Sequence, residues 1–228
     1  MAISRAFHIP GILFLFVSFV LLFLVSIGLP FLTALDFVRV HFKDGLPTVG
    51  SDTTAINQIR LGTWAACWYE TDGDRGCSAA HNAYATTIYD AQRQGFVHIA
   101  PSWTRGLAIH PVATAVTLVA LVLSFSTHVT ARLLASLAAF LAAFLTLVAF
   151  LCDIALYAWV KHQVGKLSHV GSNTDTAPGF WITFVCFLLL TFAGCTVCFG
   201  RRRDRLDGAT TYSYSWRDRF RIGRKSAV

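Results

Sequence analysis

The chain has 228 residues, of which 55% are hydrophobic and only 14% are charged, and its formal net charge is +7. A soluble domain carries about a quarter charged residues, so this composition excludes an ordinary soluble enzyme and indicates a protein built for lipid. Nine Lys and Arg residues against three Asp follow Gly200. Because the positive charge is concentrated in this tail, it does not indicate nucleic-acid binding.

Four apolar runs have the length of a membrane-spanning helix, which needs about 20 residues. They cover about residues 9–29, 107–125, 132–160 and 179–199. The first run could be a cleaved signal peptide, but it is longer than a signal h-region and has no clear Ala-x-Ala cleavage site. We therefore expect one four-helix membrane domain, residues 1–205, followed by a basic cytoplasmic tail, residues 206–228.

The connection between the first two runs, residues 30–106, is too long to be a bare loop. Leu35–Phe42 and Ile59–Tyr69 are rich in β-branched and aromatic residues, which favours strands. His81–Gln94 is interpreted as a helix that stops at Gly95. A small sheet over the helices is the expected arrangement. The second outer connection, from Lys166 to Pro178, is predicted to be a short polar loop.

Cys67 and Cys77 lie in the first loop on either side of a polar turn, Asp72–Gly76. The basic tail indicates a cytoplasmic C-terminus, and an even number of spans places both termini there, so this loop faces outside. Disulfides persist outside the cytosol. We therefore expect a Cys67–Cys77 bridge that closes a hairpin and contributes about 2–3 kcal/mol. Two free thiols are the alternative.

The third run carries an alanine stripe and one acid. Ala131, Ala135, Ala139 and Ala143 recur every four residues, a spacing that lets helices approach closely in lipid. Packing within the chain's own bundle is favoured over a homo-oligomer face. Asp153 is the only charge well inside any run, and an intramembrane acid suggests a proton or ion site. No basic partner is expected within the membrane core, so a structural role is favoured.

Cys195 and Cys198 form a Cys-x-x-Cys pair at the end of the fourth run. The pair resembles that of vitamin K epoxide reductases, in which a loop pair passes electrons to the helix pair. Sulfur atoms must touch for thiol exchange, whereas here most of a bilayer, about 30 Å thick, separates Cys195 from Cys67 and Cys77. Beside basic residues, Cys195 and Cys198 are better interpreted as palmitoylation candidates, with inert thiols as the alternative.

The tail alternates basic and aromatic residues. A Lys or Arg next to the anionic cytoplasmic leaflet gains about 1 kcal/mol, which favours lipid contact; the alternative is a solvated tail that only fixes topology. The predicted lipid-binding residues are Arg201, Arg202, Arg203, Arg217, Arg219, Arg221, Arg224 and Lys225.

No catalytic arrangement can be assembled from the sequence. It contains no hydrolase elbow and no phosphate loop, and its eight His residues are scattered without a metal-ligand spacing. The sequence therefore predicts no catalytic residue, no metal and no cofactor.

The first loop also carries a family signature. Gly62-x-Trp64-x-x-Cys67 followed by Cys77 is similar to the Gly-Leu-Trp-x-x-Cys…Cys signature of claudin-like tetraspan proteins. The chain more specifically resembles fungal PalI-domain proteins over about residues 5–205. The stretches that carry this likeness are Pro10-Gly11 and residues 102–113, 153–157, 173–181 and 198–203.

The resemblance implies a left-handed bundle of four helices, an all-α membrane class with a small disulfide-stapled extracellular β-sheet. It implies plasma-membrane residence without catalysis. PalI-type proteins assist a seven-helix sensor of ambient pH, and their relatives lie in eisosome-associated compartments. Claudins carry a further Trp upstream of the signature, where this chain has only Phe37 and Phe42, so claudin-type paracellular strands are not implied.

The leading hypothesis is a non-enzymatic accessory or scaffold for another membrane protein, either a seven-helix pH sensor or eisosome-associated proteins. Trp64 is expected beneath the sheet, and the cytoplasmic tail on anionic lipid. The alternative is a small transporter or channel component that uses Asp153.

Overall fold

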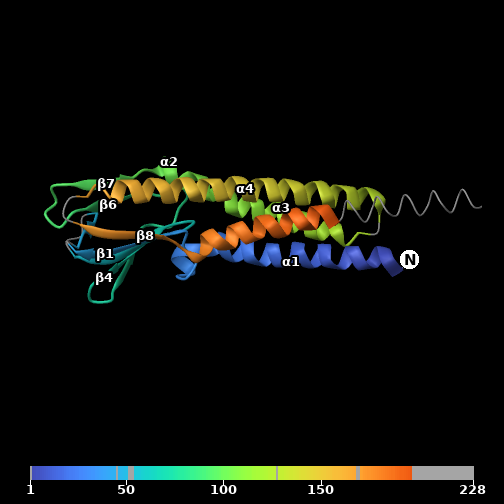
Figure 1. The fold of residues 1–228 in the computed structure, drawn as a ribbon, viewed down its shortest axis with the longest axis horizontal. Coiled ribbons are helices and arrows are strands. Elements are labelled where there is room, and N and C mark those ends of the chain that lie inside the picture. The colour runs from blue at the N-terminus through green and yellow to red at the C-terminus, as the bar shows by residue number, and fades with distance from the viewer. Residues whose placement is uncertain (1, 45, 51–53, 127, 168–169, 197–228) are drawn as a thin grey trace, which may run out of the picture.

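The computed structural model describes residues 2–44, 46–50, 54–126, 128–167 and 170–196. Its helices lie side by side in a long bundle, the strands gather at one end, and the N-terminus lies at the other end (Figure 1). Within the described residues, four helices are long and apolar enough to cross a membrane, so the four predicted spans are confirmed. These spans are Ile9–Phe31, Pro101–Ser124, Thr130–Val164 and Pro178–Thr196.

The first and third spans lie in two long helices, α1 (Ala2–Phe31), which is kinked near its end, and α4 (Val129–Val164). The second span consists of three consecutive pieces: α2 (Pro101–Thr104), a 3-10 turn η1 (Arg105–Ala108) and α3 (Ile109–Ser124). The fourth span, Pro178–Thr196, is the orange helix without a label in Figure 1. The short turn after α3 makes α3 and α4 antiparallel neighbours, as the sequence predicts.

Eight strands in the described residues form two antiparallel sheets. The larger has the order β5-β4-β3-β1-β8 and the smaller has the order β2-β6-β7. Their bounds are β1 Val38–Asp44, β2 Thr48–Val49, β3 Ile56–Leu61, β4 Ala66–Glu70, β5 Arg75–Cys77, β6 Thr86–Tyr89, β7 Phe96–Ile99 and β8 Gly171–Thr176. We call these two sheets and their connecting turns the head region.

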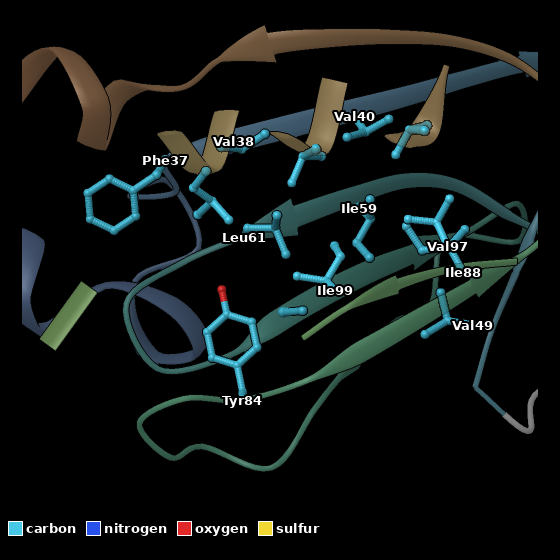
Figure 2. Packing of buried hydrophobic residues seen from close by; sticks show 14 of the residues in the cluster. Phe37, Val38, Val40, Val49, Ile59, Leu61, Tyr84, Ile88, Val97 and Ile99 are labelled. Atoms are coloured by element: carbon cyan, nitrogen blue, oxygen red, sulfur yellow. The ribbon is translucent and has the colours of Figure 1, made fainter. Parts of the chain in front are cut away.

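The core of the head region lies between the two sheets. Side chains alternate along β1, where Val38, Val40 and Phe42 are buried and the residues between them are polar, because successive side chains of a strand point to opposite faces. Figure 2 shows this apolar face opposite the residues of the smaller sheet. The facing residues of the smaller sheet are Val49, Ile88, Val97 and Ile99.

The end of α4 completes this core. The 36 residues of α4 span about 54 Å at 1.5 Å per residue, which exceeds the roughly 30 Å hydrocarbon layer. Its last turns therefore extend beyond the membrane, where Leu156, Val160 and Val164 are buried in the core of the head region. The bundle and the head region are joined through one continuous helix.

The bundle itself is packed around small residues. Ala139 and Ala143 of the predicted stripe are buried in a cluster with Leu15 and Leu22 of α1, and Ala135 of the stripe is also buried. This is the packing inside the chain's own bundle that the sequence favoured. Close approach of backbones at alanine is the usual source of helix association in lipid.

Four expectations from the sequence are corrected. The helix predicted at His81–Gln94 is wrong: this segment contains β6, and Asp90 closes the turn after it by accepting hydrogen bonds from the Gln94 and Gly95 amides at 2.9 and 3.0 Å. The run Ile59–Tyr69 is split between two strands.

The connection from Lys166 to Pro178, predicted as a polar loop, contains β8. With eight strands present, the all-α class is too narrow, although the four-helix bundle with a small sheet is confirmed.

Candidate functional site

The helix α1 is interrupted just before it ends. Gly28 and Leu29 leave the helical conformation, Gly28 with a φ of +27°, and Pro30 follows. Because Pro has no backbone N–H, the carbonyl of Ser26, four residues earlier, has no helical donor. A buried carbonyl without a donor is costly, so the broken end of α1 needs hydrogen bonds from elsewhere.

The motif turn, Gly62–Ala65 between β3 and β4, supplies them. The Trp64 indole Nε1–H donates to the Ser26 carbonyl at 2.6 Å, and the Thr63 hydroxyl donates to the Val25 carbonyl at 2.8 Å. The Trp64 amide also donates to the Leu29 carbonyl at 3.3 Å. Trp64 is half-buried, and its indole is bound to the end of α1; its packing beneath the sheet stays a prediction.

The glycine of the motif is required by close packing. A Cβ on Gly62 would overlap the Leu29 side chain. The Gly62 carbonyl accepts a hydrogen bond from the Tyr84 hydroxyl at 2.9 Å, and burial raises the pKa of Tyr84 well above its usual value. Gly62, Thr63 and Trp64 therefore act as one anchor between the head region and α1.

Cys67 and Cys77 form the predicted disulfide. The two residues are directly opposite each other in the β4–β5 pair, with the polar turn between them, so the stapled hairpin is confirmed. A Cβ on Gly76 would overlap the indole of Trp68, which is why the residue between Arg75 and Cys77 is glycine. The staple lies at the edge strand, far along the sheet from β8.

The other face of the five-stranded sheet is polar, and residues opposite each other in antiparallel strands share a face. The register produces two rows that cross all five strands. One row contains Cys77, Cys67, Arg60, Arg39 and Asp175, and the other contains Arg75, Tyr69, Gln58, His41 and Asn173. We call these ten residues the polar face.

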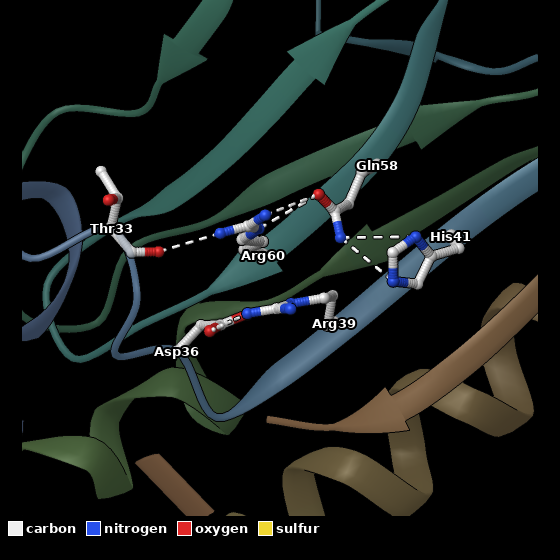
Figure 3. Close-up of polar contacts among 6 residues, drawn as sticks. All are labelled: Thr33, Asp36, Arg39, His41, Gln58 and Arg60. Carbon is white, nitrogen blue, oxygen red and sulfur yellow. Dashed lines mark hydrogen bonds and ion pairs between the residues drawn. The ribbon is translucent and has the colours of Figure 1, made fainter. Parts of the chain in front are cut away.

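Side chains of the polar face are held by one another (Figure 3). Arg60 donates to the Gln58 side-chain oxygen at 2.9 and 3.1 Å and to the Thr33 carbonyl at 2.9 Å. The Gln58 amide nitrogen donates to His41 Nε2 at 3.1 Å. The Arg60 guanidinium also lies 4.4 Å from the centre of the Tyr69 ring. The polar face is thus an ordered surface before any partner binds.

Asp36 and Arg39 secure the start of β1. Arg39 makes a two-pronged contact with Asp36 at 2.9 and 2.8 Å, and this hydrogen bonding raises the pKa of Arg39 against the opposing effect of burial. The Asp36 carboxylate is fully buried, whereas Arg39 is about one quarter exposed, at 26%. The Asp36 carbonyl accepts from the Gly179 amide at 2.9 Å, which joins β1 to the beginning of the fourth span.

Asp153 has a basic neighbour, contrary to the sequence-based expectation. His110 Nε2 lies 3.3 Å from Asp153 Oδ2, and both side chains are fully buried. His110 is only the fourth residue of the predicted run 107–125, so the sequence does not place it in the membrane core. The span begins at Pro101, which places His110 further inside it. The partner could not be found from one sequence because it comes from a different helix.

Several predicted residues lie at or beyond the limit of the described chain. Cys195 is half-buried near the end of the fourth span. Cys198 and all the basic residues predicted to bind lipid, from Arg201 to Lys225, lie outside the described residues. Palmitoylation and lipid contact stay predictions. Within the described residues, no group of three His, Cys, Asp or Glu side chains is placed to hold a metal ion.

Comparison with known proteins agrees with this architecture. A search of curated proteins finds no match. The model of the SUR7/PalI family matches residues 7–193, a range that includes the motif turn, the disulfide, the His110–Asp153 pair and almost all of the four spans. The chain is a multi-pass membrane protein and belongs to the SUR7/PalI family.

Proposed function

We propose that this protein is a non-enzymatic plasma-membrane tetraspan that acts by binding, as an accessory or scaffold for another membrane protein. Family membership supports a role in fungal ambient-pH sensing or in the organisation of cortical, eisosome-type membrane compartments. The partner would be a seven-helix pH sensor or an eisosome-associated protein. Both termini would be cytoplasmic and the head region extracellular, following the basic tail.

The observation that carries the proposal is the rigid seating of the head region. The motif turn binds the broken end of α1, the Asp36 carbonyl binds the fourth span, and α4 runs into the head core. A head held by three spans presents the polar face in a fixed orientation. Preorganised surfaces bind with a smaller entropy cost, which suits a docking protein better than a mobile loop would.

The polar face itself favours recognition over chemistry. The Arg60 guanidinium and the Gln58 amide are engaged with neighbouring side chains, and Asp36 compensates the charge of Arg39. No side chain there is placed beside a base that could activate it as a nucleophile, within the part of the chain that the structure describes. An ordered arrangement of this kind favours shape and hydrogen-bond complementarity with a partner.

The alternative, a transporter or channel component using Asp153, has less support. Asp153 and His110 are fully buried and face each other, whereas residues of a permeation path line water-filled space. Ion or proton flux through the purified protein in vesicles, abolished in Asp153→Asn, would favour this alternative over the binding role.

The binding role is tested by isolating the tagged protein from its native membrane in mild detergent and identifying its partners by mass spectrometry. We expect a membrane-protein partner that is lost in Cys67→Ser/Cys77→Ser, because this variant loosens the head, and is retained in the matched control Cys195→Ser. Recovery of the chain alone from both native membranes and cross-linked cells would contradict the proposal.

A further inference from the structure

The His110–Asp153 pair lies where three spans meet. His110 is in α3 and Asp153 is in α4. The hydroxyl oxygen of Thr183, in the fourth span, is 3.3 Å from His110 Nε2. Asp153 and His110 have no exposed surface, and neither carboxylate oxygen of Asp153 has a hydrogen bond of good geometry. A buried acid in this state requires an explanation.

The hydrogen on one ring nitrogen is fixed by the backbone. His110 Nδ1 lies 3.0 Å from the Leu107 carbonyl oxygen. A carbonyl can only accept a hydrogen bond, so Nδ1 carries a hydrogen and donates it. The other nitrogen, Nε2, decides whether the ring is neutral.

Nε2 faces two oxygens. The hydroxyl of Thr183 donates its hydrogen to the Gly179 carbonyl at 2.9 Å, so the Thr183 oxygen presents a lone pair to Nε2. The second oxygen is Asp153 Oδ2 at 3.3 Å. Without a hydrogen between them, an unprotonated Nε2 and an ionised carboxylate would direct lone pairs at each other in a dry site, which is strongly unfavourable.

We propose that His110 and Asp153 form a proton-binding site in which one proton occupies the Nε2···Oδ2 contact. With that proton in place, whichever atom carries it, the pair has no net charge. An unpaired buried charge is among the most destabilising groups in a protein. The shared proton therefore allows α3, α4 and the fourth span to pack together at this level.

The site is directly connected to the head region. The Phe37 ring lies 4.7 Å from the His110 ring, centre to centre. The backbone of Phe37 donates to the Leu61 carbonyl and accepts from the Ala177 amide, at 2.8 and 3.1 Å. Phe37 therefore has two roles: its ring covers the proton site, and its backbone joins the start of β1 to the ends of β3 and β8.

Few other titratable groups act on the pair. Among the described residues, the only one besides the two members is Cys152, which precedes Asp153 in α4. The Asp36–Arg39 ion pair begins one residue from Phe37, and its two charges compensate each other. Thr183 and Phe37 cannot titrate in this range. The pH response of the site is therefore set by His110 and Asp153.

Four proteins test the site: wild type, His110→Gln, Asp153→Asn and the double variant, each purified as the full chain in lipid nanodiscs. The midpoint temperature of thermal unfolding is measured from pH 5 to pH 8. The unfolding midpoints of the two single variants should change with pH in opposite directions. His110→Gln leaves a buried carboxylate, so its midpoint should be about 10 °C below wild type at pH 8 and should rise as pH falls and the carboxylate gains a proton.

Asp153→Asn leaves a neutral amide that donates to Nε2. Its midpoint should lie close to wild type at pH 8 and should fall towards pH 5, where His110 would become an unpaired buried cation. Wild type and the double variant, each without net charge at the site, should show no such slope. His162→Gln, at an exposed position near the end of α4, is the matched control and should follow wild type.

Parallel pH profiles for both single variants would overturn the proposal. If His110→Gln does not accumulate as folded protein, the amount of the folded double variant is measured instead. Accumulation of the double variant in the wild-type amount supports a site neutralised by one proton. Failure of the double variant to accumulate contradicts the proposal. The test does not depend on the proposed binding function, because it uses the purified chain and measures stability alone.

Discussion

The head region and the bundle are held together by different physical means. The head region is stabilised by specific contacts: a disulfide, a two-pronged ion pair and hydrogen bonds from Thr63, Trp64 and Tyr84 to backbone carbonyls. In the bundle, alanines allow close packing, and the His110–Asp153 pair is a buried charged contact between two of its helices near the head region. A change of one atom should therefore affect the head more than a similar change among lipid-facing residues.

The largest effect is expected for Gly62→Val. The added side chain overlaps Leu29 and must force β3 away from α1, so we expect a loss of about 4 kcal/mol or more, the range of severe core disruptions. Surface expression and thermal unfolding measure the loss. Gly50→Val is the control, because nothing lies within 4 Å of its Cβ position, although its positive φ of +60° adds strain of about 1 kcal/mol.

The second-largest loss of stability is expected when the disulfide is removed. Cys67→Ser/Cys77→Ser should lower the free energy of unfolding of the head region by about 2–3 kcal/mol, because the bridge closes a short loop. Reducing agent should lower the stability of the wild type to the same level and leave the variant unchanged. A variant that still responds to reduction would show that another thiol pair contributes.

Much of this architecture follows from local sequence, and the rest does not. Long apolar runs predict the spans because the bilayer fixes their length, and Cys67 with Cys77 around a polar turn predicts the hairpin. The polar strand β8 has no hydrophobic pattern, and it forms because β1 supplies its hydrogen-bond partners. The segment His81–Gln94 has an ambiguous period, and its pairing with β2 and β7 overrides local helix preference.

The contacts of the candidate sites are even less visible in the sequence. Pro30 signals that Ser26 loses a helical donor, but nothing local reveals that Trp64 replaces it. The pairing of His110 with Asp153 depends on how α3 and α4 cross. Both contacts join residues far apart in the chain, so they require the packed structure.

The third effect concerns Trp64→Phe, which keeps the ring but removes the N–H that binds the Ser26 carbonyl. A buried acceptor left without a donor costs about 1–3 kcal/mol, and thermal unfolding should register this loss. The matched control is Trp181→Phe, because the Trp181 indole bonds the Thr176 hydroxyl at 3.2 Å on an exposed surface. Loss of this exposed bond leaves no buried acceptor without a donor, so the control should lose less than about 0.5 kcal/mol.

The smallest effect is expected for Tyr84→Phe, at about 1–2 kcal/mol near neutral pH, because the Gly62 carbonyl loses its donor. Burial raises the pKa of Tyr84 in the folded protein above the unfolded value of about 10. Its stabilising contribution is therefore complete below pH 10 and is lost as pH rises further. Denaturation at pH 9 and pH 11 should show wild type losing more stability than the variant; equal losses would contradict this assignment.

The central claim is that the motif turn anchors the head region to the broken end of α1, and hydrogen exchange in nanodiscs tests it most directly. Wild type, Trp64→Phe and Trp181→Phe are compared at the amides of Leu32, Phe37 and Trp64, whose acceptors are known. We predict that exchange at all three amides becomes faster together in Trp64→Phe and stays at the wild-type rate in Trp181→Phe. Unchanged exchange at Leu32 and Phe37 in Trp64→Phe would contradict the anchor.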